Sequence, residues 1–299
     1  MSRTMRAARV HAYGGADVIR YDEIPVPSPG PGEVLVRAAA TSFNPSEVGL
    51  RAGYLHDKLD ISLPHTLGWD VAGTVAALGA GVTALEVGDA VIGLIPGAAA
   101  EYVLAPANLL TGAPRSIPLA HAAAIPVAGL TAWQAVFEQA RIERGRRVLV
   151  NGAGGGVGLF AVQLAKRAGA TVVATASPRS AEAVRRLGAD EVVDYTTTPL
   201  PGGMDVVLNL AAVPPGAAAA LAPLGRTVIT IATPIDAPNA RHFVGRADPG
   251  QLTEIAGLID KGELVVEIAE THPLTGLTDL HRRAEAGQTR GKILITLEN

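Results

Sequence analysis

The stretch that most constrains this chain is residues 148–170, VLVNGAGGGVGLFAVQLAKRAGA. An apolar segment typical of a strand runs into five glycines within seven residues, and an amphipathic helical pattern follows. Glycine is favoured where the backbone bends sharply or comes close to another group. The stretch therefore predicts a strand, a tight turn and a helix, with a close neighbour at the turn.

The turn matches the dinucleotide fingerprint G-x-G-x-x-G at Ala153, Gly155 and Gly158, with alanine in the first position. In that motif, the second glycine lets the backbone approach a pyrophosphate and the third lets the helix pack closely on the strand. The helix N-terminus offers N–H groups and a positive dipole end to the phosphates. A P-loop is excluded because no Gly-Lys-Ser/Thr follows the glycines. The alternative is a glycine-rich turn that holds no ligand.

The end of the next expected strand, 171–177, bears on which dinucleotide is bound. A cofactor with a free ribose 2′-hydroxyl favours Asp or Glu there, whereas this chain has Ala-Ser-Pro-Arg at 176–179. Ser177 can donate a hydrogen bond and Arg179 can supply a cation to a 2′-phosphate. We therefore expect NADPH rather than NADH; the alternative for Arg179 is a solvated loop residue.

The chain divides in two by its pattern. Up to about residue 123, short alternating segments between Pro- and Gly-rich turns predict an antiparallel β-rich domain, with strands at 32–40, 71–78, 89–95 and 101–106. From residue 124, nearly continuous apolar strands alternate with helical patterns, which predicts a doubly wound α/β domain. Its strands are expected at 146–152, 171–177, 190–195, 204–210 and 226–232, and its helices at 157–169, 180–189 and 216–224.

The later part of the chain adds four features to this plan. Residues 196–203 are too short for a helical crossover, which takes about a dozen residues. Residues 241–248 are expected to form a further, outermost strand, whose open edge favours pairing with a second copy. A helix is expected at 248–262, and the tail is expected to form strand, helix and strand at 263–274, 277–287 and 292–299.

Composition excludes several classes of function. The formal net charge of −3 offers no electrostatic case for nucleic acid or an anionic membrane. Cysteine is absent, so disulfides, thiolate nucleophiles and cysteine metal ligands are excluded. No signal-peptide pattern is visible at the N-terminus, and no apolar run reaches the ~18 residues of a membrane span. We expect a cytoplasmic protein.

Seven segments, in this order and spacing, resemble the medium-chain dehydrogenase/reductase superfamily, and within it the zinc-free quinone oxidoreductase (zeta-crystallin-like) branch. They are SFNPSEVGLRAGY, LPHTLGWDVAGTVAALGAGVTALEVGDAVIG, AEYVLAPANLL, AAAIPVAGLTAWQAVFE, the glycine-rich stretch above, RRLGADEVVDY and TRGKILITL. The resemblance implies a GroES-like catalytic domain at 1–123, completed by 262–299, and a Rossmann domain at 124–261. It also implies a cofactor in the cleft between the domains, and a homodimer.

The resemblance also carries individual positions. Asn44, Tyr54 and Thr131 match positions near the nicotinamide. The pyrophosphate segment is matched by Gly154, Gly155, Gly156 and Val157. Ser177 and Tyr195 match positions near the adenosine, and Ile231, Ala232 and Thr233 match the loop that contacts the cofactor after the fifth strand.

Two departures from the family matter. Gly68-Trp69-Asp70 replaces the Gly-His-Glu of the zinc alcohol dehydrogenases, so without cysteines their zinc sites cannot be built. We therefore expect no metal, and Trp69 is interpreted as a core residue. Asn209 stands where an Asp is common.

Without a Lewis acid, the substrate must itself delocalise the charge that an added hydride leaves. Quinones and α,β-unsaturated carbonyls do this, and the protein then supplies mainly proximity. Tyr54 is our candidate for a hydroxyl donor to the substrate oxygen, the alternative being packing against the cofactor. Asn44 is expected to hold a ribose hydroxyl or the substrate oxygen, unless it makes an Asx turn before Pro45. Thr131 is expected to touch the carboxamide, to cap a helix over 131–140, or both.

Three functions stay open. The first is an NADPH-dependent quinone or enone reductase. The second is an NADPH-binding sensor or structural protein with little turnover. The third is an enoyl-thioester reductase, although no acyl-carrier docking feature is visible.

Overall fold

The chain forms two compact units. The structure, a computed structural model, describes residues 3–56 and 61–297. Unit 1 comprises Met1–Val127, Ala247–Lys261 and Ile268–Asn299, and unit 2 comprises Ala128–Arg246 and Gly262–Glu267. The predicted domain limits at 123/124 and 261/262 stay a prediction, and residues 247–261 group with unit 1 in the structure.

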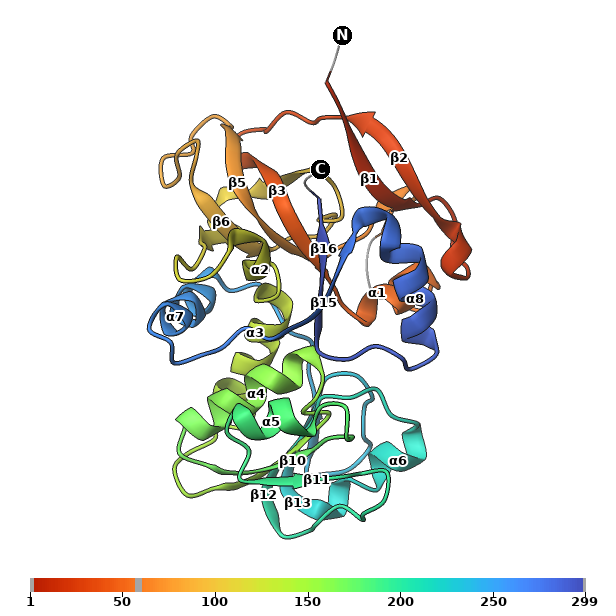
Figure 1. Ribbon diagram of the computed structural model, residues 1–299, viewed down its shortest axis with the longest axis vertical. Coiled ribbons are helices and arrows are strands. Elements are labelled where there is room, and N and C mark those ends of the chain that lie inside the picture. The colour runs from red at the N-terminus through yellow and green to blue at the C-terminus, as the bar shows by residue number, and fades with distance from the viewer. Residues whose placement is uncertain (1–2, 57–60, 298–299) are drawn as a thin grey trace. The chain divides into compact units, whose positions relative to one another are not determined.

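Unit 2 is built on a parallel six-stranded sheet of order β11-β10-β9-β12-β13-β14, part of which is labelled in Figure 1. The strands are β9 (Arg147–Asn151), β10 (Thr171–Thr175), β11 (Glu191–Val193), β12 (Met204–Asn209), β13 (Gly225–Thr230) and β14 (Ala240–His242). In chain order this is the 3-2-1-4-5-6 arrangement of doubly wound folds, whose order reverses between the first and fourth strands. The predicted α/β class is confirmed, and β14 is the outermost strand as expected.

The helices of unit 2 follow its strands. They are α4 (Gly156–Arg167), α5 (Ala181–Arg186), α6 (Pro215–Ala219) and the short 3-10 helix η4 (Ala222–Leu224). Helix α4 packs against β9 and β10, and α5 packs against β11. Residues 196–203 contain no helix, so the prediction of a short connection into β12 is confirmed.

One helix differs from its predicted bounds. The helix expected over 131–140 begins five residues earlier, as α3 (Pro126–Trp133), and continues as the π-helix η3 (Gln134–Gln139). Proline suits the first turn of a helix because its missing N–H has no partner to lose there. Thr131 lies inside α3, so the suggestion that it caps this helix is wrong.

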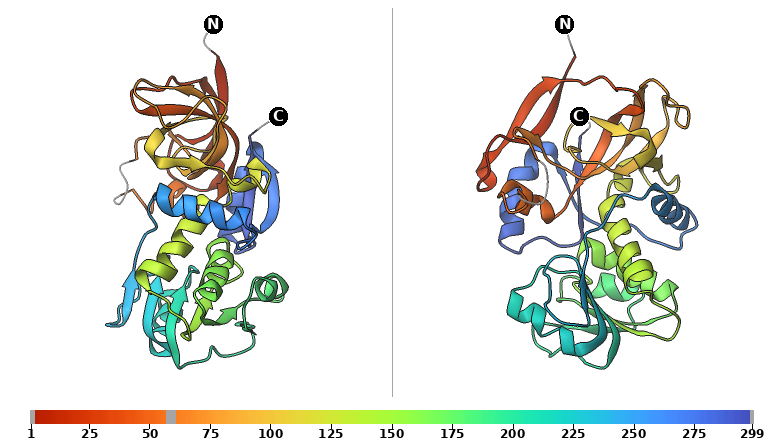
Figure 2. Two further views of the ribbon diagram at one scale, coloured as in Figure 1. Left: turned by 90° about the vertical axis from the view of Figure 1, so that its left-hand side faces the viewer. Right: turned by 180° about the vertical axis from the view of Figure 1, so that it is seen from behind.

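Unit 1 contains a three-stranded sheet of order β2-β1-β4 and a seven-stranded sheet of order β15-β16-β3-β5-β6-β8, with β7 also paired to β3. The strands are β1 (Thr4–Val10), β2 (Ile19–Pro25), β3 (Glu33–Phe43), β4 (His65–Thr66), β5 (Asp70–Leu78), β6 (Ala90–Leu94), β7 (Tyr102–Pro106), β8 (Leu110–Gly112), β15 (Ile268–Pro273) and β16 (Lys292–Thr296). Most pairs are antiparallel, as predicted, while β15 and β16 are parallel. Figure 2 shows how strongly these strands curve.

The helices of unit 1 are short apart from α7. They are α1 (Ser46–Arg51), α2 (Leu119–Ala122), α7 (Pro249–Asp260) and α8 (Leu277–Glu285), with 3-10 helices η1 (Ala16–Val18), η2 (Ala107–Leu109) and η5 (Leu274–Gly276). Helix α7 is held beside β8 by a hydrogen bond between the hydroxyls of Thr111 and Thr253, at 2.6 Å. The predicted helix and the terminal strand, helix and strand are all present.

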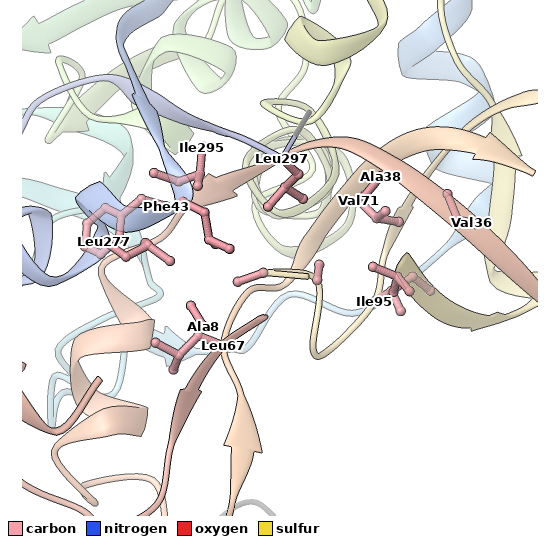
Figure 3. Packing of buried hydrophobic residues seen from close by; sticks show 14 of the residues in the cluster. Ala8, Val36, Ala38, Phe43, Leu67, Val71, Ile95, Leu277, Ile295 and Leu297 are labelled. Carbon is pink, nitrogen blue, oxygen red and sulfur yellow. The ribbon is translucent and has the colours of Figure 1, made fainter. Parts of the chain in front are cut away.

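The core of unit 1 joins segments from both ends of the chain. Figure 3 shows Phe43 from β3, Leu277 from α8 and Ile295 from β16 among its buried side chains. Ala8 from β1 and Leu67 after β4 belong to the same cluster. Burial of this apolar surface is the main favourable contribution to the unit's stability, and it fixes the last strand against β3.

Candidate functional site

The glycine-rich turn lies between Asn151, which ends β9, and Gly156, which begins α4. The Gly155 N–H donates to the Gly152 carbonyl at 3.0 Å, which closes the turn. A Cβ at Gly158 would lie 2.2 Å from the Gly152 oxygen and 2.6 Å from Ala153 Cα. A side chain there would collide with the backbone of the turn, so glycine at 158 lets α4 pack closely on the turn that follows β9.

Gly155 is different. A Cβ built there would meet, within 4 Å and apart from its chain neighbours, only the Gly152 oxygen at 3.3 Å, counting the described residues. Internal packing therefore leaves space above this glycine. Gly155 is also the N-cap of α4, and none of the side chains that the structure describes caps this helix. The first N–H groups of α4 and its positive dipole end are thus suited to an anion such as a diphosphate.

The other predicted cofactor residues of unit 2 follow its strands at the carboxyl edge of the sheet. Ser177 is half-buried and Arg179 exposed in the connection from β10 to α5, and Tyr195 is exposed after β11. Thr233, after β13, accepts a hydrogen bond from Val213 N–H at 3.2 Å and donates one to the Val213 carbonyl at 2.9 Å. The loops after β12 and β13, the second containing residues 231–233, are thereby tied together.

A row of buried polar side chains lies at the same edge. Thr175, Asn151, Asn209 and Thr230 are each the last residue of their strand, and the strands are neighbours in the order β10-β9-β12-β13. Asn209 pairs in register with Asn151 on one side and with Thr230 on the other. This row therefore crosses the sheet where the strand order reverses, which is where ligands bind in such folds.

Hydrogen bonds connect the row to the glycine-rich turn. The Thr175 hydroxyl accepts from Gly152 N–H at 2.9 Å and donates to Asn151 Oδ1 at 3.0 Å. Asn151 Nδ2 in turn donates to Asn209 Oδ1 at 2.8 Å. Asn209 is fully buried, and its Nδ2 has no hydrogen-bond partner among the described residues. A buried amide N–H without a hydrogen-bond partner lowers stability, so its position at the edge where a ligand would bind calls for an explanation.

Thr131 is nearly buried, at 7 % exposure, within α3. Gly245 lies against it, because a Cβ at Gly245 would come within 2.5 Å of Thr131 Oγ1. Gln134, one turn on, exchanges two hydrogen bonds with the Arg246 backbone, both at 3.0 Å. The segment after β14 is therefore held against α3 and η3.

In unit 1, the Asp70 carboxylate is the centre of a buried polar cluster. Its Oδ2 accepts from the Ser42 hydroxyl, from Asn44 Nδ2 at 2.8 Å and from Lys292 Nζ at 3.3 Å. Its Oδ1 accepts the backbone N–H of Val127, in the first turn of α3, at 2.6 Å. The side chains of Asp70 and Lys292 are 0 % and 4 % exposed, so the ion pair is desolvated. Such a pair is tolerated because each of the two charged groups also has a further hydrogen-bond partner.

This cluster decides what the Asn44 side chain can do. One amide hydrogen of Asn44 goes to Asp70 and the other to the Ser42 carbonyl at 3.2 Å, while Oδ1 accepts from Lys292 at 2.9 Å. Both donors are engaged, and Oδ1 keeps one lone pair. The carboxamide can therefore accept a hydrogen bond from a hydroxyl, but cannot donate one to a carbonyl oxygen without breaking the cluster.

Glu47 is a second buried acid beside this cluster. Its two oxygens accept the backbone N–H groups of Asn44 at 2.9 Å and Gly68 at 3.0 Å. Burial raises the pKa of Glu47 to about 7, with the Asp70 charge acting in the same direction and the two backbone hydrogen bonds opposing. The carboxyl group is therefore partly protonated at neutral pH.

Tyr54 follows α1 and has 80 % of its surface exposed. Its backbone N–H donates to the Gly49 carbonyl at 2.9 Å. The preceding residue, Gly53, has a φ of +89° and lies against the Tyr13 ring, whose hydroxyl bonds His56. The main chain at Tyr54 is thus held in place while its phenol projects outward.

Trp69 packs against the core of unit 1, as predicted, and its buried indole N–H has no partner among the residues described. The described residues contain no group of three His, Cys, Asp or Glu side chains that could hold a metal ion.

Neither the row of buried polar side chains in unit 2 nor the Asp70 cluster in unit 1 was predicted from the sequence. Each of the segments RVLVN, VVAT, VVLN and TVIT ends its apolar run with an amide or hydroxyl residue, and this repeated ending was the available signal for the row in unit 2. For the Asp70 cluster, Asp70 and Asn44 were each noted, but not their contact with each other or with Lys292, which lies 222 residues from Asp70 in sequence.

The sheet order and the glycine-rich turn define a Rossmann-type nucleotide-binding fold. Sequence comparison extends this. Residues 30–115 match the alcohol dehydrogenase GroES-like domain, and residues 187–295 match the domain described as zinc-binding dehydrogenase. The human mitochondrial NAD(P)H oxidoreductase RTN4IP1 is 30 % identical over 99 % of this chain and 90 % of its own length. This chain belongs to the medium-chain dehydrogenase/reductase superfamily, in its quinone oxidoreductase-like branch.

Further relatives agree with this placement. The chloroplast envelope quinone oxidoreductase homolog of Arabidopsis thaliana is 40 % identical over 65 % of this chain, and the match spans 62 % of that protein. Among solved structures, the quinone oxidoreductase from Coxiella burnetii has a TM-score of 0.90 at 28 % identity, covering 99 % of this chain and all of its own. A mycobacterial protein complexed with NADPH has a TM-score of 0.85 at 27 % identity, covering 98 % of this chain and 99 % of its own.

Proposed function

We propose that this protein is an oxidoreductase that uses NADPH to reduce a quinone or an α,β-unsaturated carbonyl compound without zinc. The observation that carries the proposal is the glycine-rich turn, where a Cβ at Gly155 would meet, among the described residues, only the Gly152 oxygen, and where the helix N-terminus has no side-chain cap. The names of the relatives, which include quinone oxidoreductases and an NAD(P)H oxidoreductase, support the same reaction class.

Bound NADPH would supply a hydride to the acceptor carbon. The turn at Gly154–Val157 would hold its diphosphate, and Ser177 and Arg179 would bind the 2′-phosphate. Tyr195 and residues 231–233 would contact the rest of the nucleotide. Thr131 would contact the carboxamide, and the free lone pair of Asn44 Oδ1 would accept a hydrogen bond from a ribose hydroxyl.

The substrate oxygen gains negative charge as the hydride is added, and it needs a donor. Asn44 has both amide hydrogens engaged within its cluster, so this role falls to the Tyr54 hydroxyl or to water. A phenol O–H can donate a hydrogen bond to a developing oxyanion. The added proton then completes the hydroquinone or the saturated carbonyl.

The central experiment measures NADPH oxidation with a benzoquinone, a naphthoquinone, an alkenal and an enoyl thioester. Turnover with the first three supports the proposal, and turnover with the thioester alone identifies an enoyl-thioester reductase. Tight NADPH binding without turnover of any acceptor would indicate a sensor or structural protein. Failure of either nicotinamide dinucleotide to change the melting temperature would overturn the proposal.

Two variants test the assigned roles. Tyr54→Phe is expected to lower kcat about 100-fold, which is the lower end of the effect of losing one positioned proton donor. Tyr102→Phe, a buried tyrosine in β7, is the matched control. Arg179→Ala is expected to raise KM for NADPH about 10-fold and leave KM for NADH unchanged, because only NADPH carries the 2′-phosphate.

Zinc independence rests on the residues themselves. The chain has no cysteine, and Trp69 stands where the zinc relatives carry a histidine ligand. Elemental analysis of the purified protein and activity after dialysis against a chelator test this directly, since a zinc enzyme would lose activity with its metal.

We also propose a homodimer formed through β14. Within the described residues β14 pairs only with β13, and Val244 just beyond it is 81 % exposed. An open edge strand favours pairing with a second copy. Light scattering is expected to give a dimer, and Val244→Asp is expected to shift it to a monomer.

None of the described helices is long and apolar enough to cross a membrane. We propose that the protein acts in the cytoplasm on a small-molecule substrate, without nucleic acid or membrane partners. Cell fractionation tests this, because recovery in an organelle or membrane fraction would contradict it.

A further inference from the structure

The row of polar side chains below the glycine-rich turn has no role in the reaction proposed above. We propose that Thr175, Asn151 and Asn209 are positioning residues for NADPH, which hold the first peptide of the turn in the orientation that receives the diphosphate. This inference rests on the proposed use of NADPH.

The argument begins at Gly152. Its carbonyl accepts the Gly155 N–H at 3.0 Å, and its N–H donates to the Thr175 hydroxyl at 2.9 Å. Its φ of +86° is a conformation that other residues rarely adopt, and a Cβ there would lie 2.9 Å from Ala211 Cβ. Gly152 is therefore held through both its N–H and its carbonyl and confined on one side, so its backbone conformation sets where Gly155 lies.

The Thr175 hydroxyl can accept from Gly152 only while its own hydrogen points elsewhere. That hydrogen is directed to Asn151 Oδ1, at 3.0 Å. The Asn151 carboxamide is kept in the required orientation because its Nδ2 donates to Asn209 Oδ1, at 2.8 Å. The three side chains thus form one directional chain of hydrogen bonds, and reversing either amide would place like groups against each other.

Asn209 carries a cost that the fold alone does not require. It is fully buried, and its Nδ2 makes no hydrogen bond within the described chain. Apolar residues at positions 175, 151 and 209 would continue the buried strands without an unsatisfied donor. The row lies where the strand order reverses, next to the turn that would hold the cofactor. A role in cofactor binding therefore accounts for the presence of polar side chains that lower stability.

The test compares NADPH affinity in wild type and in variants of β10 and β12. Thr175→Val removes the hydroxyl with little change in shape, and we expect the Kd for NADPH to rise about 10-fold, as for loss of one buried hydrogen-bond partner. We expect kcat at saturating NADPH to stay within about 2-fold of the wild-type value, because no group at the reacting atoms has changed. Thr175→Ser keeps the hydroxyl and is expected to restore Kd to within about 3-fold.

Thr171→Val is the matched control, since it makes the same chemical change at the exposed, opposite end of β10. Asn209→Leu acts two hydrogen bonds away from the turn, and we expect a Kd increase of about 3-fold. It also provides a measurement if Thr175→Val does not fold, which thermal melting would show.

Wild-type protein that binds no NADPH would overturn the proposed function. Wild-type protein that binds NADPH, together with a folded Thr175→Val variant of unchanged Kd, would overturn only this inference. A variant that keeps its Kd and loses kcat would also overturn it, because the row would then act on the chemistry rather than on the cofactor. If Thr175→Val is unfolded, an unchanged Kd in Asn209→Leu decides against the inference.

Discussion

Acid should destabilise this protein through one histidine in particular, His281 of α8. The side chain is fully buried against the Phe43 ring, with ring centroids 5.2 Å apart, and neither ring nitrogen has a hydrogen-bond partner in the described part of the chain. Burial lowers the pKa of His281 from 6.5 to about 3, and the nearby Arg51 charge acts in the same direction. The imidazole is therefore neutral in the folded protein throughout the physiological range.

The size of the effect follows from linkage. The unfolded chain takes up the proton below pH 6.5, while the folded chain does not until about pH 3. Stability is therefore fully present above pH 6.5 and is lost as the pH falls. At pH 5, the proton uptake by the unfolded state corresponds to about 2 kcal/mol, and the full loss near pH 3 to about 5 kcal/mol.

The assay compares how the difference in stability between two proteins changes with pH. Free energies of unfolding are measured by urea denaturation for wild type and His281→Phe at pH 7.5 and pH 5.0. The variant has no group to protonate at this site, so its stability relative to wild type is expected to increase by about 2 kcal/mol between the two pH values. All other titrating groups are shared and cancel.

His121→Gln is the control, because it removes a histidine whose side chain is exposed in α2 rather than buried. A wild-type to His281→Phe difference that stays constant within about 0.5 kcal/mol would refute the reasoning, since the error of such comparisons is of that order. It would mean that His281 finds a partner for its proton in the folded state.

Three further predictions concern the Asp70 cluster, Glu47 and the glycine-rich turn. Asp70→Asn is expected to cost about 3–5 kcal/mol in urea denaturation, because the Lys292 ammonium loses its counter-charge inside the protein, and Asp70→Asn combined with Lys292→Met should recover part of the loss. The folded-state pKa of Glu47 is raised to about 7, so wild-type stability should fall as the pH rises from 4.5 to 7. The stability of Glu47→Gln relative to wild type should therefore increase by about 3 kcal/mol between pH 4.5 and pH 8. A difference that does not change with pH would contradict the raised pKa. Gly158→Ala is expected to lower stability by about 3 kcal/mol through overpacking against a backbone oxygen. Gly155→Ala is expected to lower the melting temperature less, because its Cβ would lie 3.3 Å from that oxygen, and to bind NADPH more weakly. Equal melting temperatures for the two variants would contradict the distinction drawn between these glycines.

Local sequence patterns were sufficient for the elements of unit 2. Continuous apolar runs bounded by turns located its parallel strands, and the glycine-rich stretch located the junction between the first strand and α4. The start of α3 was misplaced because Thr131 resembles an N-cap, whereas Pro126 was the better signal for a first helical turn. Both features are local, and the error came from choosing between them.

The side-chain networks could not be predicted in the same way. For Asn44, the sequence left open either a contact with the ligand or an Asx turn with neighbouring residues. In the structure its carboxamide partners include residues at positions 70 and 292. Glu47 lies in a segment that reads as an exposed helix start, and its burial depends on Gly68 from another part of the chain. Long-range partners decide these roles, and no periodic pattern in a single sequence encodes them.

The ion pair between Asp70 and Lys292 also constrains how the chain is made. During synthesis, residue 70 leaves the ribosome with 222 residues still to come before its cation. Until then, the nascent N-terminal segment carries a carboxylate with no ammonium to neutralise it in the interior, and β3 lacks its neighbour β16. Unit 1 can thus complete its native packing only after residues 292–296 have been synthesised, and until then the end of β3 that pairs with β16 is left without this neighbour.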